Sequence, residues 1–170
     1  MQNTNYETVI NLIAQIINDG KQVNEHPVEI GITPTVIVKN THFNQLPLMM
    51  YGKAFNKVIY DHGITTSILH RLYNILENPQ AIYSSDSTVQ LKGSIVVVTR
   101  ELFKKDHLIV AIQPDINVGH KTVNRIASIY GKPNGVILGW DDKGLKIYRR
   151  KKCPKLPRDF GFNCLVEYER

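Results

Sequence analysis

Four polar residues lie an even number of positions apart along a strand-like segment and the turn after it. In the stretch NRIASIYGK, Asn124, Ser128 and Tyr130 stand at even positions. A regular strand would place them on one face, with Ile126 among them, because side chains alternate between faces. The serine could donate to a phosphate, the tyrosine could stack on a base or protonate a leaving oxygen, and Lys132 could hold the phosphate. These residue types predict a phosphate-binding catalytic cleft.

A histidine supplies the proton-transfer group that cleavage of RNA without a metal would need. That reaction requires a base for the 2′-hydroxyl, an acid for the 5′-oxygen and donors or cations for the phosphorane. Histidine titrates near neutral pH, and His62 stands at a predicted helix end beside Gly63, where its ring can face a cleft. The alternative is a C-terminal helix cap whose charge suits the helix dipole. The sequence leaves both interpretations open.

Other chemistry-bearing residues are weaker candidates. His70 lies in the middle of a predicted helix, and His107 lies in the turn KKDH. Glu101 could act as a base, but a salt bridge is the favoured interpretation. Arg100 and Arg125 are additional cations that could bind nucleic acid. With no histidine pair at metal-ligand spacing and no glycine-rich phosphate loop, we expect neither a metal nor a cofactor.

Positive charge is concentrated near the end of the chain. The net charge is +6, yet the segment 143–158 contains eight lysine and arginine residues and no acidic one. Such a patch attracts a polyanion. The alternative is a solvated edge that only improves solubility. We expect RNA as the partner, with nucleic acid contacted by Arg149, Arg150, Lys151 and Lys152 in addition to Arg100, Asn124 and Arg125.

Composition predicts an ordered globular protein of the cytoplasm. Of the 170 residues, 42% are hydrophobic and 21% are charged, and a chain of this length can bury its own core. The N-terminus does not resemble a secretory signal, and the apolar stretches are far shorter than the roughly 20 residues that cross a bilayer. Cys153 and Cys164 lack the spacing of a zinc or redox site. We therefore expect reduced thiols and no contact with membrane.

The first half of the chain reads as helical, with one extended segment. Apolar residues at helical spacing predict a helix over 5–19 that stops at Gly20. The β-branched stretch 28–40 predicts an edge strand or arm, because Pro34 lacks an amide hydrogen. Two further helices are expected over 46–63 and 65–78, the first with Pro47 in its first turn.

The second half reads as strands. The stretches QAIYSS, GSIVVVTREL, HLIVAIQP and VNRIASIYG are strand candidates, the second and third joined as a hairpin through FKKD. NGVILGWDDKG predicts a short helix or turn, and LKIYRRKK predicts a last strand. Helices followed by strands favour an α+β fold, with N-terminal helices on an antiparallel sheet of about five strands.

The ordered pieces also resemble a known family. Helix-end His62, Asn78-Pro79, and the stretches SIVVVT, IVAI, VNRIASIYGK and LKIY resemble the C-terminal domain of phage Mu-F-like head proteins and mobile-element polyvalent proteins. The resemblance covers residues 46–152. It divides the chain into an N-terminal helix and arm over 1–45, this domain over 46–152, and a tail over 153–170 that packs on it.

That family is similar to the barnase, EndoU, colicin and RelE group of nucleases. The resemblance therefore implies a ribonuclease. Together with the residue chemistry above, it leads us to expect a metal-independent endoribonuclease, a toxin or effector of a phage or mobile element, with His62, Ser128, Tyr130 and Lys132 as its catalytic residues. An antitoxin or immunity protein would be its second partner. The alternatives are a non-catalytic module that binds nucleic acid or an inhibitor, and a phage head-associated protein, because a shared fold does not establish activity.

Overall fold

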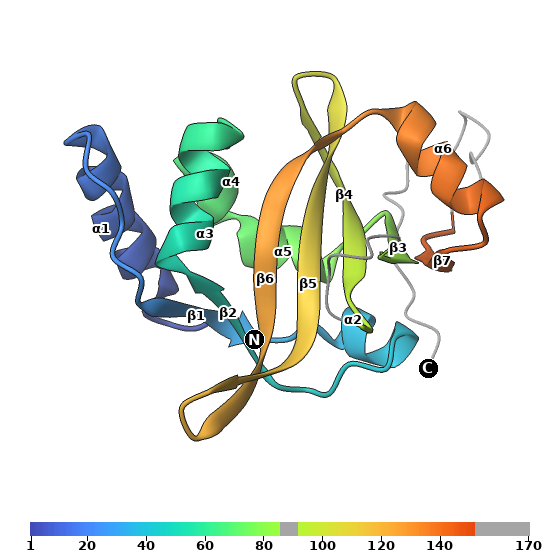
Figure 1. Cartoon of the computed structure of the whole chain (residues 1–170), viewed down its shortest axis with the longest axis horizontal. Helices are drawn as coiled ribbons and strands as arrows, with labels where there is room; N and C mark the ends of the chain where they lie inside the picture. Colours follow the sequence, from blue (N-terminus) through green and yellow to red (C-terminus); the bar gives the residue numbers. More distant parts are fainter. Residues whose placement is uncertain (86–91, 152–170) are drawn as a thin grey trace, which may run out of the picture.

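A computed structural model gives the fold over residues 1–85 and 92–151. Lys152, both cysteines and the predicted tail over 153–170 lie outside the described residues. The described part is a mixed α+β structure built on a seven-stranded sheet in the order β1-β2-β6-β5-β4-β3-β7 (Figure 1). The sheet is larger than the expected five strands because two additional strands come from the N-terminal third.

Neighbouring strands are antiparallel except for β2 and β6, which are parallel. The strands are β1 (Pro27–Ile32), β2 (Pro47–Tyr51), β3 (Ala81–Ser84), β4 (Ile95–Phe103), β5 (Asp106–Val118), β6 (Lys121–Lys132) and β7 (Lys146–Arg149). The expected hairpin of β4 and β5 is confirmed, and Lys104 and Lys105 take positive φ angles in its turn.

Six α-helices and one π-helical turn connect these strands in the described residues. They are α1 (Tyr6–Asn18), α2 (Thr35–Asn40), α3 (Gly52–Asn56), the π-helical turn η1 (Lys57–Asp61), α4 (Thr66–His70), α5 (Leu72–Glu77) and α6 (Asn134–Asp142). The expected helix over 65–78 is interrupted at Arg71, between α4 and α5.

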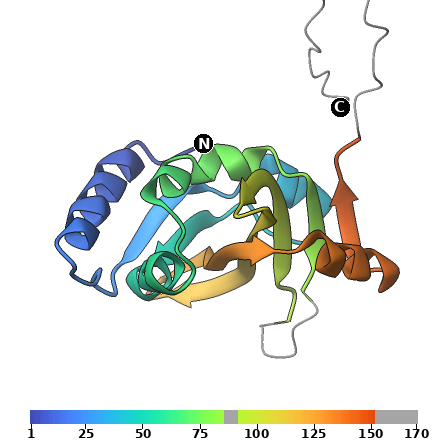
Figure 2. The same ribbon diagram turned by 90° about the horizontal axis from the view of Figure 1, so that it is seen from above.

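The two faces of the sheet are covered differently. Helices α1 to α5 gather on one face, and their apolar side chains form the larger core with residues such as Val97, Val110 and Ile126. Figures 1 and 2 show α6 apart from these helices, beside β7. Ile137 of α6 packs against a smaller cluster on the opposite face, which includes Val98 and Ile109. The second face therefore carries less helical cover than the first.

Two predicted elements differ from the observed ones. The expected helix over 46–63 begins as strand β2, because Leu48, Met49 and Met50 are all buried between β1 and β6. A helix of this segment could not bury three consecutive side chains on both sides of its backbone. The expected edge strand over 28–40 ends at Ile32, and helix α2 starts directly after Pro34, which suits a helix start.

The expectation that Asn124, Ser128 and Tyr130 share one face is wrong. Ile126 pairs with Ile112 and Ser128 pairs with Ala111, so Ala127 is an extra residue opposite one bond of β5. Such a bulge reverses the alternation of side chains beyond it. Asn124 and Ile126 consequently face the helices, whereas Ser128 and Tyr130 face the side of α6.

No helix within residues 1–85 and 92–151 is both long and apolar enough to span a membrane.

Candidate functional site

His62 lies beside the part of β6 that follows Ile126, where β2 no longer pairs with this strand. Among the described strands, β2 pairs with β6 only as far as Ile126. Beyond that point the His62 ring takes the free edge, and its Nδ1 lies 2.7 Å from the carbonyl oxygen of Ile129. A carbonyl only accepts hydrogen bonds, so Nδ1 carries the hydrogen. In the neutral ring, Nε2 is then left with a free lone pair that can accept a proton.

Tyr130 lies next to this histidine, and Lys132 lies next to Tyr130. The rings of His62 and Tyr130 meet edge to face with centroids 5.6 Å apart. The Lys132 ammonium lies over the Tyr130 ring, 5.4 Å from its centroid. Burial raises the pKa of the Tyr130 phenol above its usual value of 10.0, so the hydroxyl keeps its proton at neutral pH. The structure thus brings together three of the four predicted catalytic residues.

Ser128, the fourth, occupies a different environment. Its hydroxyl is buried, and within the described residues no atom makes a hydrogen bond with it. A hydroxyl without solvent contact cannot reach a phosphate that binds at the surface. The structure therefore places Ser128 beneath the site.

Asn124 and Arg125 do not join the site either. The Asn124 side chain is 0% exposed, and its amide donates to Thr33 Oγ1 at 2.8 Å and to the Asn44 carbonyl at 2.9 Å. These contacts rule out the predicted role in binding nucleic acid, because a buried, satisfied amide cannot contact RNA. Arg125 donates to Gln113 Oε1 and stacks on Tyr51, away from His62.

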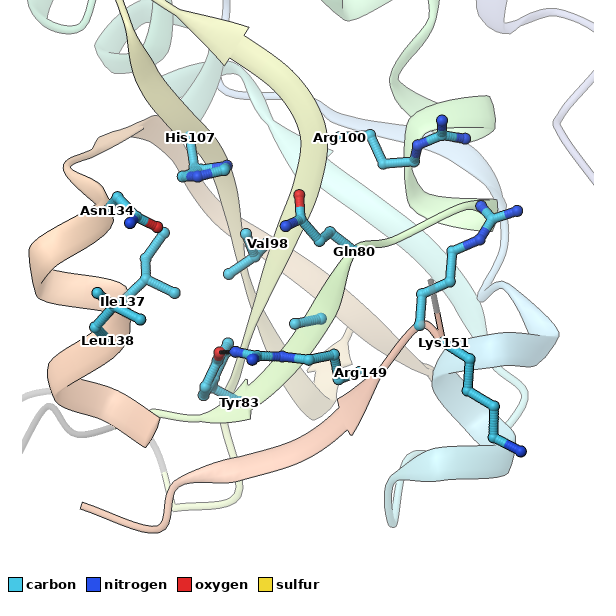
Figure 3. Close-up of a pocket in the computed structure, with 12 residues that line it drawn as sticks. Gln80, Tyr83, Val98, Arg100, His107, Asn134, Ile137, Leu138, Arg149 and Lys151 are labelled. Atoms are coloured by element: carbon cyan, nitrogen blue, oxygen red, sulfur yellow. Dashed lines mark hydrogen bonds between the residues drawn. The ribbon is translucent and has the colours of Figure 1, made fainter. Parts of the chain in front are cut away.

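A pocket of about 670 Å³ opens on the face of the sheet that carries Tyr130 (Figure 3). Figure 3 shows Ile137 and Leu138 of α6 on one side, Lys151 on the other, and Val98 between them, with the Arg149 side chain extending from β7 to Tyr83. Its lining contains four of the cations predicted to bind nucleic acid, which are Arg100, Arg149, Arg150 and Lys151. The sequence separates Arg100 from the other three by almost fifty positions, and the antiparallel pairing of β4, β3 and β7 brings them together.

His107 connects the pocket to the group of His62, Tyr130 and Lys132, although its place in the sequence makes it only a weak candidate. It lines the pocket, and its Cα pairs with that of Lys132 across β5 and β6. Ile109 pairs with Tyr130 in the same way. His107 Nδ1 is buried and has no hydrogen-bond partner in the part of the chain that the structure describes. Its signal in the sequence was its place two residues before Ile109, on the same strand face.

Arg149 is held in place by two groups from neighbouring elements. Its guanidinium donates to Tyr83 Oη at 2.7 Å and forms an ion pair with Asp141. Burial acts to raise the pKa of the Asp141 carboxyl, but hydrogen bonds from Arg149 and Tyr83 outweigh it and lower that pKa below 3.8. Burial also raises the pKa of the Tyr83 phenol. Together these contacts join α6, β3 and β7 around the pocket.

The contacts of Glu101 account for this remaining candidate. The favoured salt bridge of Glu101 is confirmed, since Arg71 binds both carboxylate oxygens, at 3.0 and 3.2 Å. Across residues 1–85 and 92–151, no three histidine, cysteine or acidic side chains gather as a metal site would require.

Comparison with known proteins gives the family. No curated protein and no solved structure matches the chain. The family model of the phage MuF-C-terminal domain matches residues 53–155, which is more than half of the chain. That range starts within α3 and contains His62, Tyr130, Lys132 and the whole pocket lining. The chain therefore belongs to the phage MuF-C-terminal domain family.

Proposed function

We propose that this domain is a metal-independent endoribonuclease that cleaves RNA through attack of the 2′-hydroxyl. One observation carries the proposal: His62, Tyr130 and Lys132 form a contact chain that continues through the cross-strand partner His107 into a pocket rich in cations. The proposed proton-transfer groups, at the edge of β6 and on its pocket-facing side, thus adjoin the proposed phosphate-binding groups. That is the combination that phosphodiester cleavage needs.

The proposed reaction starts at His62. Its Nε2 accepts the proton of the ribose 2′-hydroxyl, since Nδ1 is occupied by the Ile129 carbonyl. The 2′-oxygen then bonds to phosphorus as the bond from phosphorus to the 5′-oxygen breaks. Tyr130, which keeps its proton at neutral pH, donates to that departing oxygen. The products are a 2′,3′-cyclic phosphate and a free 5′-hydroxyl.

Lys132 would stabilise the charge that develops on the phosphate oxygens. Its ammonium lies over the Tyr130 ring and therefore close to the proposed proton donor. A cation aimed at the transition state lowers the barrier more than it strengthens substrate binding. Arg100 and Arg150 would contact flanking phosphates of the RNA, because both line the neighbouring pocket.

The alternative proposal is a module that binds RNA or an inhibitor without cleaving. It is favoured by the burial of Ser128, because one predicted catalytic hydroxyl cannot reach a bound phosphate. The pocket cations would bind RNA equally well in that case. The family places the chain among phage proteins, so a head-associated role belongs with this alternative, and a toxin or effector with a dedicated antitoxin belongs with the ribonuclease.

Incubation of the purified chain with total RNA, with and without EDTA, tests the proposal. We expect cleavage in both conditions and a 2′,3′-cyclic phosphate on the upstream fragment, because the ribose hydroxyl is the nucleophile and no step uses a metal. Intact RNA in both conditions would leave the binding module as the better description. Cleavage that stops with EDTA would reject the metal-free reaction.

A further inference from the structure

The pocket beside α6 has two walls of different chemistry. One wall is apolar and comes from α6 and the sheet, where Ile137, Leu138, Val98 and Ala81 line it. The other side of the pocket in Figure 3 carries the cations Arg100 and Lys151, and Arg150 lines the pocket as well. A ligand that fills this space must therefore present a flat or apolar part to one side and negative charge to the other.

The cations of this pocket are unequally compensated. Arg149 is paired with Asp141. Within residues 1–85 and 92–151, by contrast, the side chains of Arg100, Arg150 and Lys151 form no ion pair with a carboxylate. Several uncompensated cations around one pocket repel each other, and a bound anion removes that repulsion. The described residues thus offer to an anionic group one arginine held by Asp141 and three cations that lack a carboxylate partner among them.

We propose that this pocket binds one nucleotide unit of the RNA, with the base against Ile137 and Leu138 and its phosphate on Arg100 and Arg150. The inference rests on the proposed function, in which RNA is the substrate. The volume of about 670 Å³ lies within the roughly 300–1,000 Å³ of small-molecule sites. Since His107 both lines the pocket and pairs with Lys132, the bound unit would flank the cleaved bond and fix the register of the RNA.

Trp140 gives a direct signal for binding. It is the only tryptophan of the chain, and its ring lies 5.5 Å from that of Tyr83, which lines the pocket. Titrating the full chain with each ribonucleoside 3′- and 5′-monophosphate should change Trp140 fluorescence for at least one of the eight. The free nucleoside and inorganic phosphate should each bind at least tenfold more weakly than that nucleotide. The nucleoside can contact only the apolar side of the pocket, and phosphate can contact only the cations. Equal binding of inorganic phosphate, or no response to any nucleotide, overturns the proposal.

Paired variants locate the effect. Leu138→Ser and Arg150→Ala should each weaken nucleotide binding about tenfold, since they remove an apolar contact and a charge-assisted contact. Leu12→Ser on α1 is a matched control, because Leu12 is 56% exposed and Leu138 is 51% exposed. Lys121→Ala at the distant end of β6 is the control for charge. If the control variants weaken binding as much as the pocket variants, the pocket is not the site.

A final arm separates an RNA unit from a free nucleotide. A short single-stranded oligoribonucleotide should displace the bound mononucleotide, and failure to displace it would overturn the assignment to RNA. Because the signal is binding, the result is independent of cleavage. A nucleotide that binds while RNA stays intact supports the pocket and rejects the ribonuclease. If RNA is cleaved but no nucleotide binds, the ribonuclease is supported and the nucleotide pocket is rejected.

Discussion

The two ring nitrogens of His62 have different surroundings, and the proposed mechanism uses only one of them. Nδ1 donates to the Ile129 carbonyl at the free edge of β6 and fixes the orientation of the ring. Nε2 is the nitrogen proposed to transfer the proton. The sequence offered a cap and a catalytic base as alternatives, but the structure shows that one side chain can serve an architectural contact without giving up its second nitrogen.

Two substitutions of His62 should distinguish these roles. His62→Ala removes both nitrogens, and we expect RNA cleavage to fall by roughly 10²-fold or more and stability to fall by about 1 kcal/mol because the hydrogen bond is absent. His62→Asn retains an amide donor for Ile129 but has no base, so activity should fall equally while stability recovers. His70→Ala is the control. Cleavage rates measure the activity of each variant, and urea unfolding measures its stability. If His62→Asn stays active, the assignment of His62 as the proton-transfer group is wrong.

Lys132 and the pocket cations should affect different kinetic steps. We expect Lys132→Ala and Tyr130→Phe to lower the single-turnover rate more than RNA affinity, since their contacts strengthen in the transition state. The double variant Arg150→Ala with Lys151→Ala should instead weaken binding to many RNAs. A plot of the logarithm of the binding constant against the logarithm of the salt concentration should also become less steep. Its slope should change by about 0.7 for each phosphate group that the protein no longer neutralises. Arg149 is left intact because it holds α6 and β7 together.

If the Lys132 and Tyr130 variants change affinity alone, the proposed catalytic cluster is only a binding surface. If the double variant abolishes cleavage of RNA already bound, the chemistry lies in the pocket instead.

At the scale of the elements, β6 positions the residues of the candidate site. Its pairing with β2 stops at Ile126, the bulge at Ala127 follows directly, and the strand then continues to Lys132. The early end of β2 leaves room for His62 at the edge, and the bulge turns Tyr130 toward the face that carries the pocket. Both features act within a few residues, so the edge and the face become one site.

The contact of Asp141 with Arg149 and Tyr83 should make the α6–β7 region sensitive to acid. The pKa of Asp141 is lowered in the folded protein, so its stabilising effect is present above the unfolded value near 3.8 and is lost as the pH falls through the lower, folded value. We expect Asp141→Asn to lower the Tm at pH 7. This difference should stay constant down to about pH 5 and shrink below pH 3.8.

Thermal unfolding of both proteins between about pH 2 and 7 measures this difference. A gap between the two Tm values that persists unchanged at the lowest pH would show that the carboxylate charge is not what stabilises the contact.

At the scale of the whole molecule, the N-terminal third is part of the larger core, on the face of the sheet opposite the pocket. Strand β1 pairs with β2, and the larger core includes Tyr6, Ile10, Ile30 and Ile37 as fully buried side chains. The family match begins only at residue 53. The matched segment therefore packs against residues that lie outside it.

Removal of residues 1–45 should prevent folding of the remainder. Each buried side chain that is removed contributes about 1.5–3 kcal/mol, and several together exceed the roughly 5–15 kcal/mol that keeps a domain folded. Circular dichroism and thermal unfolding of a chain that starts at residue 46 should show no cooperative transition. A cooperative transition would mean that the matched segment is stable by itself.

The sequence by itself determined the elements whose local pattern has one solution. Apolar spacing and Gly20 predicted the first helix, alternation and turn residues predicted β3 to β7, and the FKKD turn predicted the β4–β5 hairpin. Residue chemistry also selected His62, Tyr130 and Lys132, which the structure brings into contact. These features follow from propensity and periodicity within short windows.

Only the tertiary structure decided the rest, because the deciding contacts join distant parts of the chain. The stretch LMM becomes strand β2 since β1 and β6 bury it on both sides. The bulge at Ala127 exists only in the pairing with β5, so the sequence could not show that Asn124 and Tyr130 face opposite ways. His107 joined the site for the same reason: a strand shows its neighbours only after the sheet is assembled.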